Sequence, residues 1–203
     1  MFQKLTQRVR EAHTRPYLKQ SVSLTALGVE GFQTAVESIE EIHRLFSRNF
    51  PEGALEGWAP SQFEGFLTID AANRFFTHCS LANAADIIPF STTIDPDGVL
   101  KKGITERYIH TSENVVEYYE KTTVGERTRS EYIDNYTGHY LSLSRYISIN
   151  PVKFQYGDIV EAQVSFQTVA LKGGKYKMLV VLRALTLLDA MPTKVRSSLN
   201  AVQ

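Results

Sequence analysis

A β-hairpin pattern near the C-terminus constrains the fold of this chain most strongly. From residue 160 to 167, apolar and polar side chains alternate, so that one face of a strand carries Val160, Ala162, Val164 and Phe166. The run from Tyr176 to Leu188 is apolar on both faces, which is typical of a strand in the middle of a sheet. Between the two runs, Gly173-Gly174 predicts a two-residue loop in a primed turn, because glycine accepts a positive φ without strain. The sequence therefore predicts a hairpin over residues 158–188.

An amphipathic helix is the second clear pattern. From Glu30 to Phe46, apolar side chains recur at the spacing of one helix face, and the acidic side chains lie away from that face. Asn49-Phe50-Pro51 predicts the end of this helix, because proline cannot continue it. Residues 1–20 have a shorter helical pattern that is rich in arginine and ends at Arg15-Pro16, so we expect a basic amphipathic N-terminal helix there.

The order of these patterns predicts an α+β protein. We expect a mainly helical segment over residues 21–90, including a short helix that Asp70 caps and that runs to Cys79. Residues 91–190 are rich in Tyr, Thr, Val and Ile between turn-forming breaks, which favours an antiparallel β-rich domain containing the hairpin. Residues 191–203 are expected to form a C-terminal tail. The expected architecture is therefore N-terminal helices packed on a small barrel or a curved sheet.

Hydropathy and cysteine content indicate where the protein works. No apolar run approaches the ~20 residues that a membrane helix needs, so no membrane partner is expected. The lone Cys79 cannot form a disulfide within the chain. Both features favour an intracellular location, cytoplasmic or nuclear. A mitochondrial location is the alternative, because the first residues are rich in arginine and poor in acidic side chains.

Charge is distributed unevenly along a chain whose formal net charge is zero. Residues 1–20 carry five basic side chains against one acidic, and residues 140–203 carry eight basic against three acidic. The centre of the sequence is correspondingly acidic. Packing of the ends against the centre would neutralise these charges, whereas a basic face left open would attract nucleic acid or anionic lipid. The sequence leaves both interpretations open.

Motifs of catalysis and metal binding are missing from the sequence. His78-Cys79 are neighbours, but adjacent side chains on a helix or strand face apart, which favours a structural cysteine. The five histidines lack the spacing of zinc ligands, and Asp95-Pro96-Asp97-Gly98 has the composition of a turn without the later ligands of a calcium loop. We therefore predict no catalytic residue, cofactor or metal; an enzyme whose residues converge only in the fold is an alternative.

A binding function rests on the aromatic and basic side chains of the C-terminal half. Tyr132, Tyr136 and Tyr140 share one face whether their segment is a strand or a helix, because a spacing of four fits both periods. Tyrosines on such a face can stack on bases above a basic groove, which predicts single-stranded nucleic acid as the partner. The basic residues of this hypothesis are Arg145, Lys172, Lys175, Lys177 and Arg183. Two alternatives stand: the tyrosines line the β-core, or the chain is a protein-interaction or self-assembly module that uses sheet edges.

The hairpin also carries a resemblance. The run GDIVEAQVSFQTVALKGGKYKMLVVLRALTLLD, with NVVEYYEK upstream, resembles a multi-copy group of short proteins of mushroom-forming basidiomycete fungi. The resemblance covers roughly the C-terminal half of the chain. It implies a fungal source, and it implies no activity, substrate or site, since none is established for that group.

Overall fold

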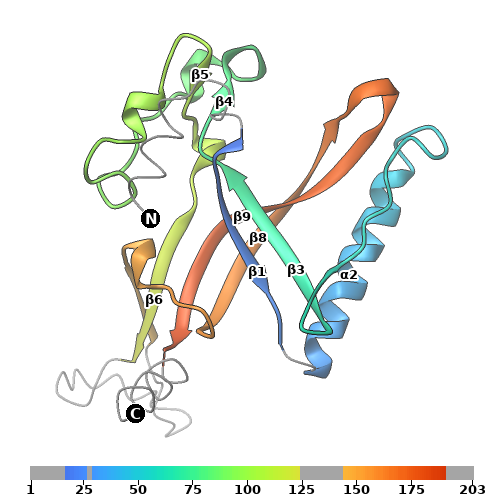
Figure 1. Ribbon diagram of the computed structural model, residues 1–203, viewed down its shortest axis with the longest axis horizontal. Coiled ribbons are helices and arrows are strands. Elements are labelled where there is room, and N and C mark those ends of the chain that lie inside the picture. The colour runs from blue at the N-terminus through green and yellow to red at the C-terminus, as the bar shows by residue number, and fades with distance from the viewer. Residues whose placement is uncertain (1–16, 27–28, 124–143, 191–203) are drawn as a thin grey trace, which may run out of the picture. The chain divides into compact units, whose positions relative to one another are not determined.

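The computed structural model describes residues 17–26, 29–123 and 144–190 (Figure 1). The chain forms two compact units, and each is described by itself. Of the described residues, the first unit comprises those up to Phe90 together with Gly98–Val116 and Val164–Arg183. The second comprises Ser91–Asp97 and the described residues of Glu117–Gln163 and of the chain from Ala184 onward.

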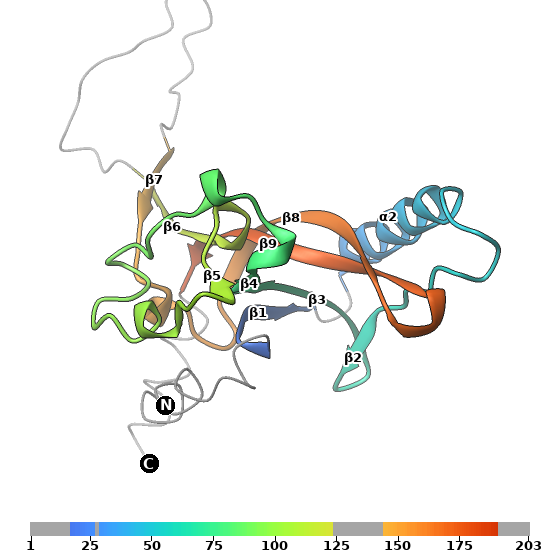
Figure 2. The ribbon, with the colours of Figure 1, turned by 90° about the horizontal axis from the view of Figure 1, so that it is seen from above.

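A three-stranded antiparallel sheet lies in the first unit. Its strands are β1 (Lys19–Leu24), β2 (Ser61–Phe63) and β3 (Phe66–Arg74), in the order β1-β3-β2. Glu64 and Gly65 both have a positive φ, of 49° and 84°, which is the backbone of a primed two-residue turn between β2 and β3 (Figure 2). From Ile69 to Arg74, buried residues of β3 alternate with exposed or half-buried ones, as expected of a strand with one face on the core.

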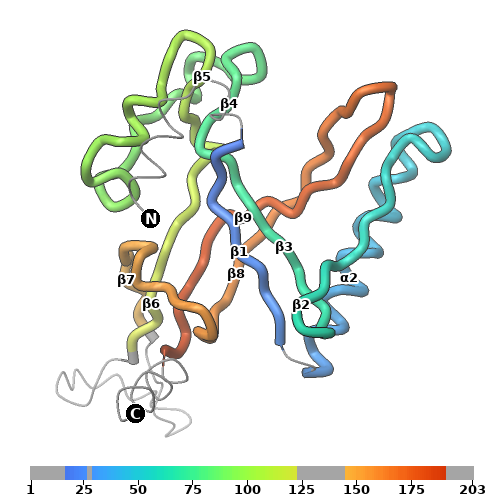
Figure 3. Tube along the Cα trace, viewed as in Figure 1, coloured from blue at the N-terminus to red at the C-terminus, as the bar shows by residue number. Residues whose placement is uncertain are grey.

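The helix of the first unit is α2 (Glu30–Ser47), with Val36 and Ile39 buried and its acidic side chains exposed. The chain leaves α2 beside the tip of the C-terminal hairpin (Figure 3). There Tyr176 exchanges backbone hydrogen bonds with the segment after the helix: its N–H donates to Ala54 O, and its carbonyl accepts from Glu56 N–H. The ring centroids of Phe50 and Tyr176 are also 4.4 Å apart. The segment after the helix therefore packs against the hairpin where β9 begins.

The long hairpin belongs to a four-stranded sheet with the order β7-β6-β9-β8. Its strands are β6 (Glu117–Thr123), β7 (Ser144–Ser148), β8 (Ile159–Ala170) and β9 (Tyr176–Asp189). Strand β6 is antiparallel to β7 and parallel to β9. Eight residues of β9 are buried, whereas none of β8 is, so β9 supplies the core and β8 lies at an edge.

The remaining strands and the 3₁₀ turns are short. Strands β4 (Thr77–His78) and β5 (Tyr108–Ile109) pair antiparallel in the first unit. The 3₁₀ turns cover Cys79–Leu81, Ala84–Asp86, Lys101–Gly103, Ser112–Asn114, Pro151–Lys153 and Lys172–Gly174.

Several expectations from the sequence are confirmed. The helix from Glu30 is present, the C-terminal hairpin is present, and the described residues combine a helix with mostly antiparallel strands, which agrees with an α+β class in its broad sense. Along β8, Val160, Ala162, Val164 and Phe166 are half-buried as the alternation predicts. No helix in the described ranges is long and apolar enough to cross a membrane.

Other expectations need correction. The described part of residues 21–90 is not mainly helical, because strands β1 to β4 accompany α2 there. The sheets of the described residues are open, with no closed barrel. The hairpin loop contains three residues rather than two, since Leu171 N–H donates to Lys175 O at 2.7 Å; both glycines nevertheless have the expected positive φ, of 74° at Gly173 and 71° at Gly174. The N-terminal helix and the tail lie outside the described residues, apart from positions 17–20, of which Lys19 and Gln20 belong to β1.

The helix expected from Asp70 to Cys79 is also wrong, and Asp70 itself shows why. It sits within β3, and its carboxylate accepts hydrogen bonds from Ser23 Oγ at 2.5 Å and Ser61 Oγ at 2.6 Å, one from each flanking strand. These two hydroxyls lower the pKa of Asp70, with Ser23 the larger cause. The side chain thus fastens three strands together, where the sequence suggested a helix cap.

Candidate functional site

The structure describes the arginine residues of the nucleic-acid hypothesis but not its tyrosines. Tyr132, Tyr136 and Tyr140 lie outside the described residues. Arg145 is exposed on β7 in the second unit, whereas Arg183 lies on β9 in the first unit. The stacking face therefore stays a prediction.

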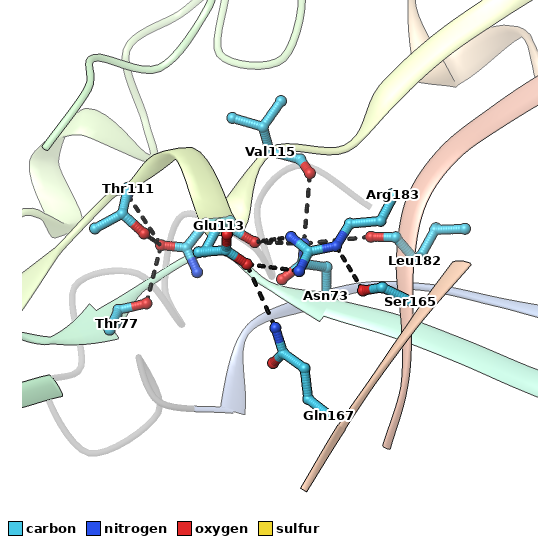
Figure 4. A network of polar contacts seen from close by, with 10 residues as sticks. Asn73, Thr77, Thr111, Glu113, Val115, Ser165, Gln167, Leu182 and Arg183 are labelled. Carbon is cyan, nitrogen blue, oxygen red and sulfur yellow. Dashed lines mark hydrogen bonds and ion pairs between the residues drawn. The ribbon is translucent and has the colours of Figure 1, made fainter. Parts of the chain in front are cut away.

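Arg183 has a structural role. Its Nε donates to Ser165 Oγ at 2.8 Å, one terminal nitrogen donates to the carbonyl oxygen of Glu113 at 2.9 Å, and the other pairs with the Glu113 carboxylate (Figure 4). The side chain is 27% exposed. Bonds to both a carbonyl and a carboxylate hold the guanidinium in place.

The lysines of the hairpin tip differ from one another. Lys175 Nζ donates to the carbonyl oxygen of Gly53 at 2.8 Å, so this side chain ties the tip to the segment after α2. Lys172 and Lys177 are exposed, and within the described ranges neither forms an ion pair with a carboxylate. Two of the predicted basic residues are thus accessible at the tip.

A buried polar network, missed by sequence reasoning, lies beside Arg183 (Figure 4). Asn114 is 1% exposed, and its Oδ1 accepts hydrogen bonds of 3.0 Å from Thr77 Oγ1, Thr111 Oγ1 and Thr111 N–H. Asn73 Nδ2 donates to the carbonyl oxygens of Glu113 and Leu182 at 2.9 and 3.3 Å. Every buried side-chain nitrogen and oxygen in the described residues has a partner. The network therefore fastens the 112–114 turn to β3 and β9, and it offers no unsatisfied group to a ligand.

His110 is the most unusual titratable side chain in the first unit. It is 5% exposed, its Nδ1 lies 2.9 Å from the carbonyl oxygen of Phe75, and its ring stacks on Phe90 with centroids 3.8 Å apart. Burial lowers its pKa, because the charged imidazolium loses its hydration there. No three His, Cys, Asp or Glu side chains of the described residues gather closely enough to hold a metal ion.

We expect acid to destabilise the protein through His110. The unfolded chain protonates this residue near the ordinary pKa of 6.5, while the folded protein keeps it neutral to a lower pH. The stability that depends on neutral His110 is therefore complete above pH 6.5 and falls as the pH drops towards the lowered pKa. Urea unfolding at several pH values between 7.5 and 5.5 measures this. His110→Gln, which cannot be protonated, should lose less stability over the same range, and equal slopes for the two proteins would contradict the assignment.

The open edge of β8 is the strongest candidate for a functional surface. In the described sheet β8 has one neighbouring strand, β9. Because Leu171 N–H points to Lys175 O across the hairpin, backbone groups of alternate residues before it point to β9, and those between point away. The outward-pointing set in the first unit is Val164, Phe166, Thr168 and Ala170.

The amino-acid composition of this edge does not discourage pairing with another chain. Natural edge strands usually carry lysine, proline or a bulge that discourages pairing with another chain. The segment Val164–Ala170, which we call the edge segment, contains no charged residue, no proline and no glycine. None of its seven residues is buried. A strand of this kind is a template for a further strand, and the charge-free run is the sequence signal that would have identified it.

Comparisons with known proteins found no relative of this chain. Neither protein-family models, nor curated proteins, nor solved structures gave a match to this chain.

Proposed function

We propose that this chain is a protein-binding module that receives an extended polypeptide on the edge segment of β8. The observation that supports the proposal is the combination of an outermost strand with an uncharged, unburied seven-residue run. Adding a strand satisfies backbone N–H and C=O groups at the edge, and this mode of recognition depends on main-chain hydrogen bonds more than on particular side chains. The fungal source implied by the resemblance remains a prediction.

Side chains of the edge segment would select the bound strand. On one face Val164, Phe166 and Thr168 are half-buried, so an added strand would extend that face with apolar or β-branched residues. On the other face Gln167 is exposed between the half-buried Ser165 and Val169, so the side chain opposite Gln167 should be polar. The preferred ligand is therefore an extended segment in which β-branched and polar residues alternate.

Amide hydrogen exchange tests whether the edge is open. At low protein concentration, the amides of Phe166 and Thr168 should exchange quickly, and those of Ser165 and Gln167, which face β9, should exchange slowly. Residue-resolved mass spectrometry measures both sets. Slow exchange at all four positions would show that another part of the chain covers the edge.

Peptide selection tests the function itself. Short random peptides displayed on phage should yield extended, alternating sequences that bind the full chain. Thr168→Pro removes one outward N–H, which an edge strand tolerates, and should abolish capture of these peptides; Thr168→Val keeps the N–H and should retain it. A cooperative melt of the proline variant confirms that it folds, and Ala170→Pro provides a second block at the same edge. Peptides that bind both proline variants as well as wild type would overturn the proposal.

Binding of single-stranded nucleic acid at the hairpin tip is the second candidate, favoured by the exposed Lys172 and Lys177. Reversing both lysines to glutamate should weaken binding of a labelled oligonucleotide and flatten its salt dependence, because fewer counterions are released. Tyr136→Ala should weaken binding with little change in the salt slope, since stacking involves no ion release. Fluorescence anisotropy at two salt concentrations measures both effects. No binding at low salt would remove this candidate.

A further inference from the structure

We infer that a second copy of this chain occupies the edge segment, with the two β8 strands antiparallel about a twofold axis at Gln167. The inference rests on the proposed function and names its partner. Each copy would offer the same open strand to the other, which is the isologous arrangement of a closed dimer.

Self-complementary side chains support this register. With Gln167 opposite itself, Phe166 lies opposite Thr168 of the second copy, and Val164 lies opposite Ala170. Each of these pairs sets a larger side chain against a smaller one. Residues of the half-buried face meet residues of the same face, so pairing joins two apolar surfaces without turning either towards water.

Charges at the ends of the edge segment favour an antiparallel second copy. Glu161 precedes the segment and Lys172 follows it. Antiparallel pairing brings Glu161 of one copy near Lys172 of the other, at both ends of the paired strands, whereas parallel pairing would bring like charges together. The formal net charge of the chain is zero, so long-range repulsion does not oppose association.

The backbone pattern fixes the geometry at the axis. Gln167 has its N–H and C=O directed at β9, so the two Gln167 residues would form a non-hydrogen-bonded pair with Cα atoms about 4.5 Å apart. The outward-pointing Phe166 and Thr168 of opposite copies would exchange both N–H···O bonds. Seven paired residues make a small interface, so the dimer should be weak and depend on protein concentration.

Cysteine cross-linking tests the register. In a Cys79→Ser background, Gln167→Cys should form an intermolecular disulfide under mild oxidation, because the expected Cα separation lies within disulfide range. Gln163→Cys, on the same exposed face, is the matched control. In the inferred dimer the two residues at position 163 are about 27 Å apart, from eight residues at ~3.4 Å each, so the control should cross-link at least about tenfold less. Equal cross-linking of the two variants would overturn the register.

A charge exchange tests self-pairing in solution. Gln167→Lys and Gln167→Glu each place like charges opposite one another at the axis and should weaken self-association about fivefold, as measured by sedimentation. Mixing the two variants should restore a heterodimer, because opposite charges then meet. Since Gln167 is exposed and its hydrogen bond to Glu113 Oε2 is long, at 3.4 Å, both variants should fold. A mixture that stays as monomeric as its components would overturn the inference.

The outcomes separate this inference from the proposed function. A wild-type chain that stays monomeric up to roughly 100 μM, yet captures displayed peptides through the edge, would overturn self-pairing and leave the protein-binding module in place. A chain that neither associates nor captures peptides would overturn both.

Discussion

Replacing Asn114 by leucine should lower the free energy of unfolding by about 2 to 5 kcal/mol. The Asn114 side chain is 1% exposed, and its Oδ1 accepts hydrogen bonds from three donors on Thr77 and Thr111. Leucine has a similar volume but no hydrogen-bond acceptor. The variant would therefore leave these donors without a partner in the interior, and it would not create a large cavity. Each stranded donor costs about 1 to 3 kcal/mol, and local relaxation recovers part of the sum.

A matched asparagine provides the control for this prediction. Asn150 also accepts a backbone hydrogen bond, from Val152 N–H at 2.9 Å, but it is exposed and water can replace its oxygen. Asn150→Leu should therefore cost only about 1 kcal/mol, as for the loss of a helix cap. Urea unfolding of both variants measures the two costs. Similar small losses would mean that the network around Asn114 is open to water.

The strongest local patterns of the sequence predict its structure well. The helix from Glu30 and the alternation along β8 follow from periodicity, because each element buries one face and the sequence records that face. The positive φ of Gly173 and Gly174 follows from the chemistry of glycine. These features depend on residues close together in the chain, so they can be identified without knowing the fold.

The failed expectations depend on contacts between distant segments. Asp70 resembles a helix cap locally, but its carboxylate is held by Ser23 and Ser61, which reach it only when β1 and β2 flank β3. Arg183, which the sequence assigns to a ligand site, pairs with Glu113, 70 positions away, and this contact too forms only in the fold; the ligand role of Arg183 stays a prediction. A local pattern predicts how a segment folds but not which distant residue its side chains contact, so such contacts are harder to predict than the hairpin.

The open edge of β8 could be predicted from the sequence only in part. The lack of charge in Val164–Ala170 is visible in the sequence, but whether a strand lies at the edge or in the middle depends on sheet order. The sequence predicts that β9 is central because both of its faces are apolar, and an alternating neighbour is then expected outside it. The same reasoning distinguishes the two strands of the hairpin, because a strand with two apolar faces is expected to be more buried than an alternating one.

Phe76→Ala should lower the free energy of unfolding by about 3 to 5 kcal/mol, whereas Phe166→Ala should lower it by roughly half as much or less, because the two rings differ in burial. Phe76 is 1% exposed and meets Phe90 edge to face, with ring centroids 5.7 Å apart, so its removal leaves a cavity. Phe166 lies half-buried on β8, where water can enter the space that its ring leaves. Both variants delete the same atoms, so the comparison isolates burial.

Chemical denaturation of the two phenylalanine variants decides between the central and edge positions. Equal costs of about 3 to 5 kcal/mol would place Phe166 in a closed core and would imply that β8 is covered. The unequal costs that we expect would mean that the β8 side of the hairpin faces water in the free chain. Phe166→Ala should then also weaken self-association, since this ring lies opposite Thr168 in the inferred dimer, while Phe76→Ala should leave the association of the remaining folded protein unchanged.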